Sequence, residues 1–210
     1  GLDHSVWRFL LFSSAALLVL GFLRPAASSV LGKVDFALLG LLALWPFTLA
    51  VFSFLNNMGD AFHATDPIGH AVRFAAPLAL ILLSFNPNQL WQTRVDWLLR
   101  LSVAGAFIGH GLCAWWIKPS FIDLIVGTLD TLLGQDLVAS ASRQAFAEAS
   151  LPVIAVQDFI LVALLLLPNR KIRTVAMWMA IWGFVTAMSR MTAYGWGNWH
   201  DLALRICNGG

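Results

Sequence analysis

The stretch "PVIAVQDFILVALLLLP", residues 152–168, is apolar at nearly every position and carries a single carboxylate, Asp158, near its centre. A helix needs roughly 20 mostly apolar residues to cross the hydrocarbon core of a bilayer. Across the 210 residues, 59% of the side chains are hydrophobic and 11% are charged, whereas soluble domains carry about 25% charged residues. The sequence therefore predicts an all-α integral membrane protein.

Further apolar segments of similar length predict a polytopic transmembrane helix bundle of about six spans. The segments are approximately 6–23, 36–55, 71–85, 97–117, 151–167 and 174–196. The third is short and contains Pro77, which predicts a kink or an earlier start.

The loops between these segments alternate in charge. The first, third and fifth contain Arg24 and Lys33, then Arg94, then Arg170, Lys171 and Arg173. The second and fourth carry mainly acidic residues, namely Asp60, Asp66, Asp123, Asp130, Asp136 and Glu148. Cytoplasmic loops are enriched in Lys and Arg. The pattern predicts an even number of spans in a bacterial inner membrane, with both termini on the non-cytoplasmic side. The net charge of +2 gives no support for nucleic-acid binding.

The fourth loop contains "SFIDLIVGTLDTLLGQDL", residues 120–137, in which apolar residues form a broad helical stripe interrupted by aspartates. This pattern predicts an interfacial amphipathic helix before span five. The segment that follows, residues 138–150, is predicted to be a second short helix or an ordered loop. Trp7, Ala16 and Gly21 recur at Trp97, Ala106 and Gly111, which suggests two similar halves, residues 1–96 and 97–210.

Three ionisable residues lie inside predicted spans and well away from the span ends: Asp158, His110 in "FIGHGL" (residues 107–112) and Arg190 in "TAMSRMTAYGW" (residues 186–196). Such groups are costly in a membrane and usually face a partner or a cavity. One interpretation is a structural clasp in which Asp158 and Gln157 contact Arg190. A second is a proton or quinone site with His110, and a third is contact between Asp158 and another subunit.

The second loop, "DAFHATDPIGH" (residues 60–70), contains Asp60, His63, Asp66 and His70. Carboxylate and imidazole together suit zinc or another divalent ion, although Pro67 breaks the helix before His70 and a loop of this composition can simply be solvated. In "GAFIGHG" (residues 105–111), Gly105, Gly109 and Gly111 predict close helix packing, since Gly105 and Gly109 have GxxxG spacing.

Two stretches resemble the DoxX-like family of membrane proteins. They are "LLRLSVAGAFIGHGLCAWWIKPSFIDLI" (residues 98–125) and "VQDFILVALLLLPNRKIRTVAMWMA" (residues 156–180), with Arg100 and Asp158 at the matching positions. The resemblance covers the second half of the chain and implies association with membrane redox systems, including thiosulfate:quinone oxidoreductases. DoxX-like proteins are typically four-helix bundles with a lysine soon after the glycine, where this chain has Ala114 and Trp115 and a displaced Lys118.

The sequence thus predicts a membrane subunit of a larger redox or energy-transducing complex, mainly structural or in contact with quinone and lipid, and with other membrane subunits as partners. One alternative is a quinone-linked oxidoreductase subunit with an intramembrane proton-transfer site. Another is a small transporter in which Pro46, Pro77 and Pro152 interrupt helices around a midplane site. No covalently bound cofactor is predicted.

Overall fold

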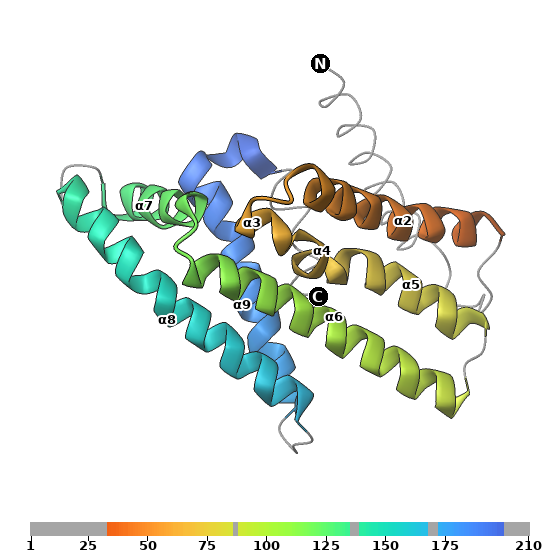
Figure 1. The fold of residues 1–210 in the computed structure, drawn as a ribbon. Coiled ribbons are helices and arrows are strands. Elements are labelled where there is room, and N and C mark those ends of the chain that lie inside the picture. The colour runs from red at the N-terminus through yellow and green to blue at the C-terminus, as the bar shows by residue number, and fades with distance from the viewer. Residues whose placement is uncertain (1–32, 86–87, 135–138, 168–171, 200–210) are drawn as a thin grey trace.

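The computed structural model describes residues 33–85, 88–134, 139–167 and 172–199, and all regular secondary structure within them is helical. The predicted first span, residues 6–23, lies outside the described residues, as do the chain termini. The helices (Figure 1) are α2 (Lys33–Asn56), α3 (Ala61–Ala64), α4 (Asp66–Gly69), α5 (Ala71–Phe85), α6 (Gln89–Trp115), α7 (Pro119–Leu133), α8 (Ser140–Leu166), α9 (Ile172–Tyr194) and the 3₁₀ turn η1 (Trp196–Asn198). The predicted all-α fold is confirmed.

Four of the described helices are long and apolar enough to cross a membrane. They are the Phe36–Asn56 part of α2, then α6, α8 and α9. Helix α5 has 15 residues, which at 1.5 Å per residue is about 22 Å and is shorter than a hydrocarbon core of about 30 Å. The four long helices support an integral membrane protein.

Two long helices begin earlier than predicted. Helix α6 starts at Gln89 because the Asn88 side chain caps it, accepting a hydrogen bond of 3.0 Å from the Trp91 N–H. The predicted boundary between residues 96 and 97 therefore falls within a continuous helix. Helix α8 starts at Ser140 and takes in most of the segment predicted as a separate helix or loop, since its alanine-rich sequence favours helix.

The three prolines that were predicted to interrupt helices lie inside continuous helices. Pro46 lies inside α2, Pro77 inside α5 and Pro152 inside α8, and each helix continues past its proline. The predicted interruptions are therefore wrong. The structure accordingly gives no support from broken helices for the transporter interpretation.

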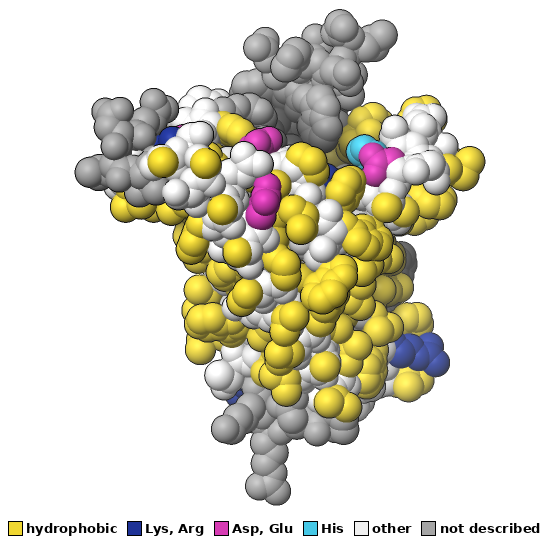
Figure 2. All heavy atoms as spheres, turned by 60° about the vertical axis from the view of Figure 1, so that its left-hand side comes forward, with side chains coloured by type: hydrophobic (Ala, Val, Ile, Leu, Met, Phe, Trp, Pro, Cys, Tyr) yellow, Lys and Arg dark blue, Asp and Glu magenta, His cyan; other side chains and the backbone are white. Residues whose placement is uncertain are grey.

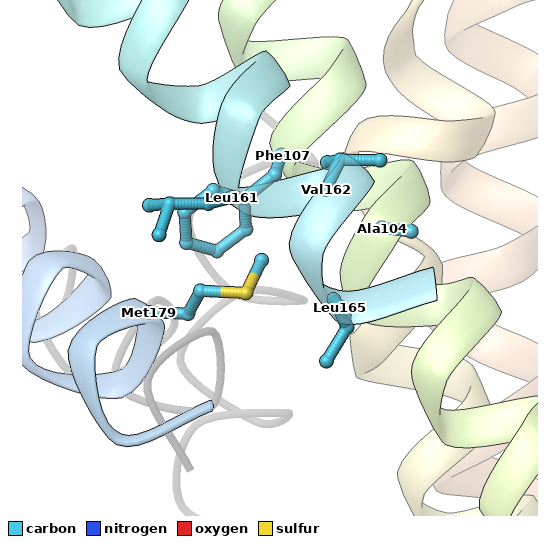
Figure 3. Packing of buried hydrophobic residues seen from close by; sticks show 6 residues of the cluster. All are labelled: Ala104, Phe107, Leu161, Val162, Leu165 and Met179. Carbon is cyan, nitrogen blue, oxygen red and sulfur yellow. The ribbon is translucent and has the colours of Figure 1, made fainter. Parts of the chain in front are cut away.

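Helices α2, α5 and α6 lie side by side, and α6 also packs along α8 (Figure 1). Apolar side chains from α6, α8 and α9 form a buried cluster, in which Phe107, Leu161 and Met179 point toward one another (Figure 3). Ala104, Val162 and Leu165 complete this cluster. We call these six residues the apolar core.

The outer surface is mostly hydrophobic. Figure 2 shows apolar side chains over the middle of one face, with acidic side chains gathered near its upper end. Among the large apolar side chains that are more than half exposed are Leu41 and Phe52 on α2, Val153 and Ile160 on α8, and Met177 on α9. A soluble monomer rarely exposes so much apolar surface, whereas lipid tails cover such a surface without cost.

Helix α7 overlaps most of residues 120–137, the segment predicted to be an amphipathic helix, and packs on α9 and α8. The Thr128 hydroxyl donates to the Ser189 carbonyl at 3.2 Å, and the Thr131 hydroxyl donates to the Thr192 carbonyl at 2.6 Å. Arg143 at the start of α8 forms an ion pair with Asp130 of α7. These contacts hold α7 across the ends of α8 and α9.

Candidate functional site

Asp158 is buried where α8 meets α6, with 3% of its surface exposed. A Cβ atom at Gly111 of α6 would lie 3.3 Å from the Asp158 Cβ and 2.8 Å from Phe159 Cε1. Real Cβ atoms rarely approach other atoms so closely, so residue 111 must be small for the two helices to pack at this distance. The contact places Asp158 beside the residue that follows His110 in the chain.

Among the described residues, Trp182 of α9 is a hydrogen-bond partner of the Asp158 carboxylate. Its Oδ1 atom is buried and has no hydrogen-bond partner among the described residues. Within the same residues no ion pair joins Asp158 to Arg190, whose Nη1 donates instead to the Thr186 carbonyl at 3.0 Å. The direct ion pair of the clasp interpretation is therefore not formed.

A cavity of about 190 Å³ lies between α6, α7, α8 and α9, and its lining includes Asp158, His110 and Arg190. The three ionisable residues thus come from three helices and share one space. The rest of the wall is mainly apolar and includes Phe107, Phe121, Leu124, Ile125, Leu151 and Ile154. We call this space the apolar cavity.

Gln157, the fourth residue of the predicted polar cluster, does not line the apolar cavity. The Gln157 Nε2 atom is buried and has no hydrogen-bond partner among the described residues.

A second cavity, of about 150 Å³, shares His110, Phe121 and Arg190 with the first. Its other lining residues come from α4 and the residues that cap it, from the second half of α6, and from the start of α7. They are Thr65, Asp66, Gly69, His70, Gly109, Cys113, Lys118 and Ser120. Because most of these residues are polar, we call it the polar cavity.

The four residues predicted as a metal site separate into two groups. His63 lies between two carboxylates, with its Nδ1 atom 3.0 Å from Asp66 Oδ2 and its Nε2 atom 3.7 Å from Asp60 Oδ2. The Nδ1 atom of His70 instead lies 2.8 Å from the Asp66 backbone carbonyl, and His70 lines the polar cavity. Within the described part of the chain, no group of three or more His, Cys, Asp or Glu residues is arranged to hold a metal ion.

Asp66 is the best-connected carboxylate of this loop. Its Oδ2 atom accepts a hydrogen bond of 2.6 Å from the Ser53 hydroxyl and also contacts His63. Burial raises the pKa of Asp66. The hydrogen bonds from Ser53 and His63 and the nearby charge of His70 together lower the pKa by more than burial raises it, so the pKa lies below its ordinary value of 3.8. Asp66 is therefore ionised at neutral pH.

The glycines of α6 pack against two different partners. Gly105 and Gly109 face the short helix α4, where a Cβ at Gly105 would lie 3.3 Å from the Ile68 carbonyl oxygen and one at Gly109 2.9 Å from the Gly69 nitrogen. Gly111 faces α8. The GxxxG pair thus contacts a short helix in the second loop rather than another long span.

The sequence did not indicate two residues that line the cavities, Trp182 and Lys118. Trp182 lies in the middle of α9, whereas Trp97 and Trp196 lie at the ends of predicted spans, where tryptophan is commonly found as an interfacial anchor. A buried indole usually finds a hydrogen-bond acceptor, so a mid-span tryptophan was the available signal. Lys118 lines the polar cavity although it lies outside every predicted span, and no local pattern indicated this.

Comparisons with known proteins found no family model, curated protein or solved structure that matches this chain. The chemistry of the two cavities therefore carries the functional assignment.

Proposed function

We propose that this chain is an integral membrane subunit of a redox or energy-transducing complex, and that it binds the ring of a quinone in the apolar cavity. The observation that supports this proposal is the meeting of Asp158, His110 and Arg190 on an otherwise apolar wall. Ionisable residues within membrane helices usually mark a ligand site or a path for ions or protons.

The cavity has the size of one ring. An apolar cavity of about 150 Å³ is large enough to bind benzene, so a space of about 190 Å³ accommodates a substituted six-membered ring but not a whole isoprenoid tail. Val185 lines the cavity and is 48% exposed. The tail of the ligand can leave the cavity at this side chain and continue among the lipid tails.

The polar atoms on the wall suit both oxidation states of a quinone. A quinone carbonyl accepts hydrogen bonds, for which the imidazole of His110 and the guanidinium of Arg190 are donors. A hydroquinone hydroxyl donates, and Asp158 Oδ1 is a buried acceptor with no other partner among the described residues. In this proposal a partner subunit supplies or removes the electrons, and the chain described here positions the ring and exchanges protons with it.

The proposal includes the topology predicted from the sequence. In this topology the four long helices are four of about six spans. The other two are α5, which at about 22 Å requires a locally thinner bilayer, and the predicted span of residues 6–23, which lies outside the described residues. Helix α7 lies at the membrane interface, and both termini lie on the non-cytoplasmic side of a bacterial inner membrane. This orientation rests on Arg24 and Lys33, Arg94, and Arg170, Lys171 and Arg173 in the first, third and fifth predicted loops, since Lys and Arg are enriched in cytoplasmic loops. Membership of the DoxX-like family belongs to the same proposal.

Quinone binding to the purified protein tests the ligand. The protein in mild detergent is incubated with a short-chain ubiquinone or menaquinone analogue, and bound quinone is measured after equilibrium dialysis. We expect saturable binding that Asp158→Asn weakens for the hydroquinone, because the carboxylate acceptor is lost. Asp123→Asn is the matched control, because Asp123 is exposed on α7 and lines neither cavity. Absence of saturable binding to the wild type would overturn the ligand assignment.

Purification from the native membrane tests the assignment as a subunit. A tagged chain extracted with mild detergent should co-purify with membrane subunits that carry a redox cofactor, visible by absorption spectroscopy and mass spectrometry. A monodisperse chain without partners would contradict membership of a complex.

A further inference from the structure

His110 lies at the boundary between the two cavities. The apolar cavity and the polar cavity have three lining residues in common, namely His110, Phe121 and Arg190. The rings of His110 and Phe121 are tilted by 35° to one another, with their centroids 6.2 Å apart. These two side chains and Arg190 therefore belong to the wall that the two cavities share.

The polar cavity is suited to water. A buried water molecule needs about 10–15 Å³ of accessible space and two to four polar partners, and a cavity of about 150 Å³ lined by Asp66, His70 and Lys118 provides both. Asp66 also contacts His63, whose side chain is 37% exposed. The polar cavity is thus linked to the surface at the end of the bundle where α3 and α4 lie.

The opposite direction is closed by the apolar core. Relative to Asp158, its members lie further along α8, and relative to His110 and Trp182 they lie earlier along α6 and α9. Phe107, Leu161 and Met179 fill the space between the three helices (Figure 3). Since this core offers no polar atoms to carry a proton, the polar cavity is the available route between Asp158 and water.

Of the three shared residues, only His110 can pass a proton. An imidazole takes up and releases protons near neutral pH and has two ring nitrogens that can serve two sides. Arginine keeps its proton at all physiological pH values, and phenylalanine has none to exchange. Apart from Asp158, His110 and Arg190, the polar side chains that line the apolar cavity are Trp182, Thr186 and Ser189, all from α9, and none of them titrates near neutral pH.

We propose that His110 carries protons between the polar cavity and Asp158. In the inward direction a hydronium ion in the polar cavity protonates one ring nitrogen and leaves water. The other ring nitrogen then gives its proton to the Asp158 carboxylate, directly or through one water molecule, and the imidazole is neutral again. The path opens at the α3–α4 end of the bundle. Only the identity of the final proton acceptor, a quinone, rests on the proposed function.

The exchange rate of the Asp158 carboxyl proton tests the relay. The full chain in lipid nanodiscs is held at a pH at which this carboxyl is protonated, and its C=O band, assigned by its loss in Asp158→Asn, is followed by infrared spectroscopy after a change from H₂O to D₂O. We expect His110→Gln and His110→Ala to slow the exchange by about 100-fold. Added imidazole should restore the rate in His110→Ala, which a merely structural role would not allow.

The matched control is Asp123→Asn, at an exposed position of α7 that lines neither cavity, and it should leave the rate unchanged. If the His110 variants do not fold, the wild-type site still provides a test. Cys113 lines the polar cavity, and its modification with methyl methanethiosulfonate in a Cys207→Ser background should slow the exchange by narrowing the path. Exchange at the wild-type rate in folded His110→Gln, or in the modified protein, would overturn the relay. Quinone binding is measured on the same samples, so loss of the ligand assignment and loss of the relay are separate outcomes.

Discussion

Gly109 of α6 lies directly against Gly69 of α4, so closely that a Cβ on Gly109 would be 2.8 Å from the Gly69 Cα. Both glycines line the polar cavity. The contact therefore holds α4 against α6 at the residue next to His110, and it forms part of the wall through which the proposed proton path runs.

Gly109→Ala should destabilise this contact, because the opposing atoms belong to the backbone and cannot turn away. We expect a loss of about 1–3 kcal/mol in the free energy of unfolding, measured by titration with SDS in mixed micelles. Gly40→Ala in α2 is the control, since nothing lies within 4 Å of a Cβ at that position and alanine favours a helix by about 1 kcal/mol over glycine. Equal effects of the two substitutions would contradict the packing argument.

The hydrogen bond between Trp182 and Asp158 should appear as a coupling energy. Trp182→Phe removes the donor and should lower the free energy of unfolding by about 1–3 kcal/mol, because the buried carboxyl loses its partner. In an Asp158→Leu background the same substitution should have a much smaller effect. Trp178→Phe, at a position of α9 that is 49% exposed, should be nearly neutral in both backgrounds. A coupling energy of zero would show that the two side chains do not interact.

Asp66 should make stability depend on pH in the acid range. The pKa of Asp66 in the folded protein lies below its ordinary value of 3.8, so the folded state favours the ionised form. The resulting stabilisation is fully present above the unfolded pKa and is lost as the pH falls through the folded pKa. Unfolding measured from neutral pH to below this range should show a smaller loss of stability in Asp66→Asn than in the wild type. The control is Asp123→Asn at an exposed position, which should leave the dependence of the unfolding free energy on pH unchanged. The same dependence on pH in Asp66→Asn as in the wild type would contradict the prediction.

The ion pair between Arg143 and Asp130 should help α7 to form its wall of the apolar cavity. The two side chains are 11% and 24% exposed, so solvent screens them incompletely. A double-mutant cycle with Arg143→Gln and Asp130→Asn should give a coupling of about 1–2 kcal/mol, and Arg143→Gln should also weaken quinone binding. The pair Arg100–Asp96 within α6, whose carboxylate is 53% exposed, should give less than about 1 kcal/mol. A smaller coupling energy for Arg143–Asp130 than for Arg100–Asp96 would contradict the prediction that the contact between α7 and α8 is stabilising.

The sequence was informative where membrane chemistry restricts the choice of residue. Long apolar segments predicted α2, α6, α8 and α9 because a backbone in lipid must satisfy its own hydrogen bonds. Charges inside such segments are rare, so Asp158, His110 and Arg190 could be selected without any knowledge of packing. The starts of α6 and α8 were predicted too late because both helices extend into polar sequence, where hydropathy no longer indicates helix.

The sequence by itself determined that this protein is helical, that it belongs in a membrane and that Asp158 is a carboxylate inside a long apolar segment. Only the tertiary structure decided that Asp158 contacts Trp182, that Gly109 meets Gly69 in a short helix of the second loop, and that His110 lies between two cavities. The physical reason is that lipid tails and a protein core are equally apolar. Hydropathy therefore shows that a helix is buried in the membrane but not which of its faces packs against protein, and residues distant in the chain, such as His70, His110 and Arg190, meet only through that packing.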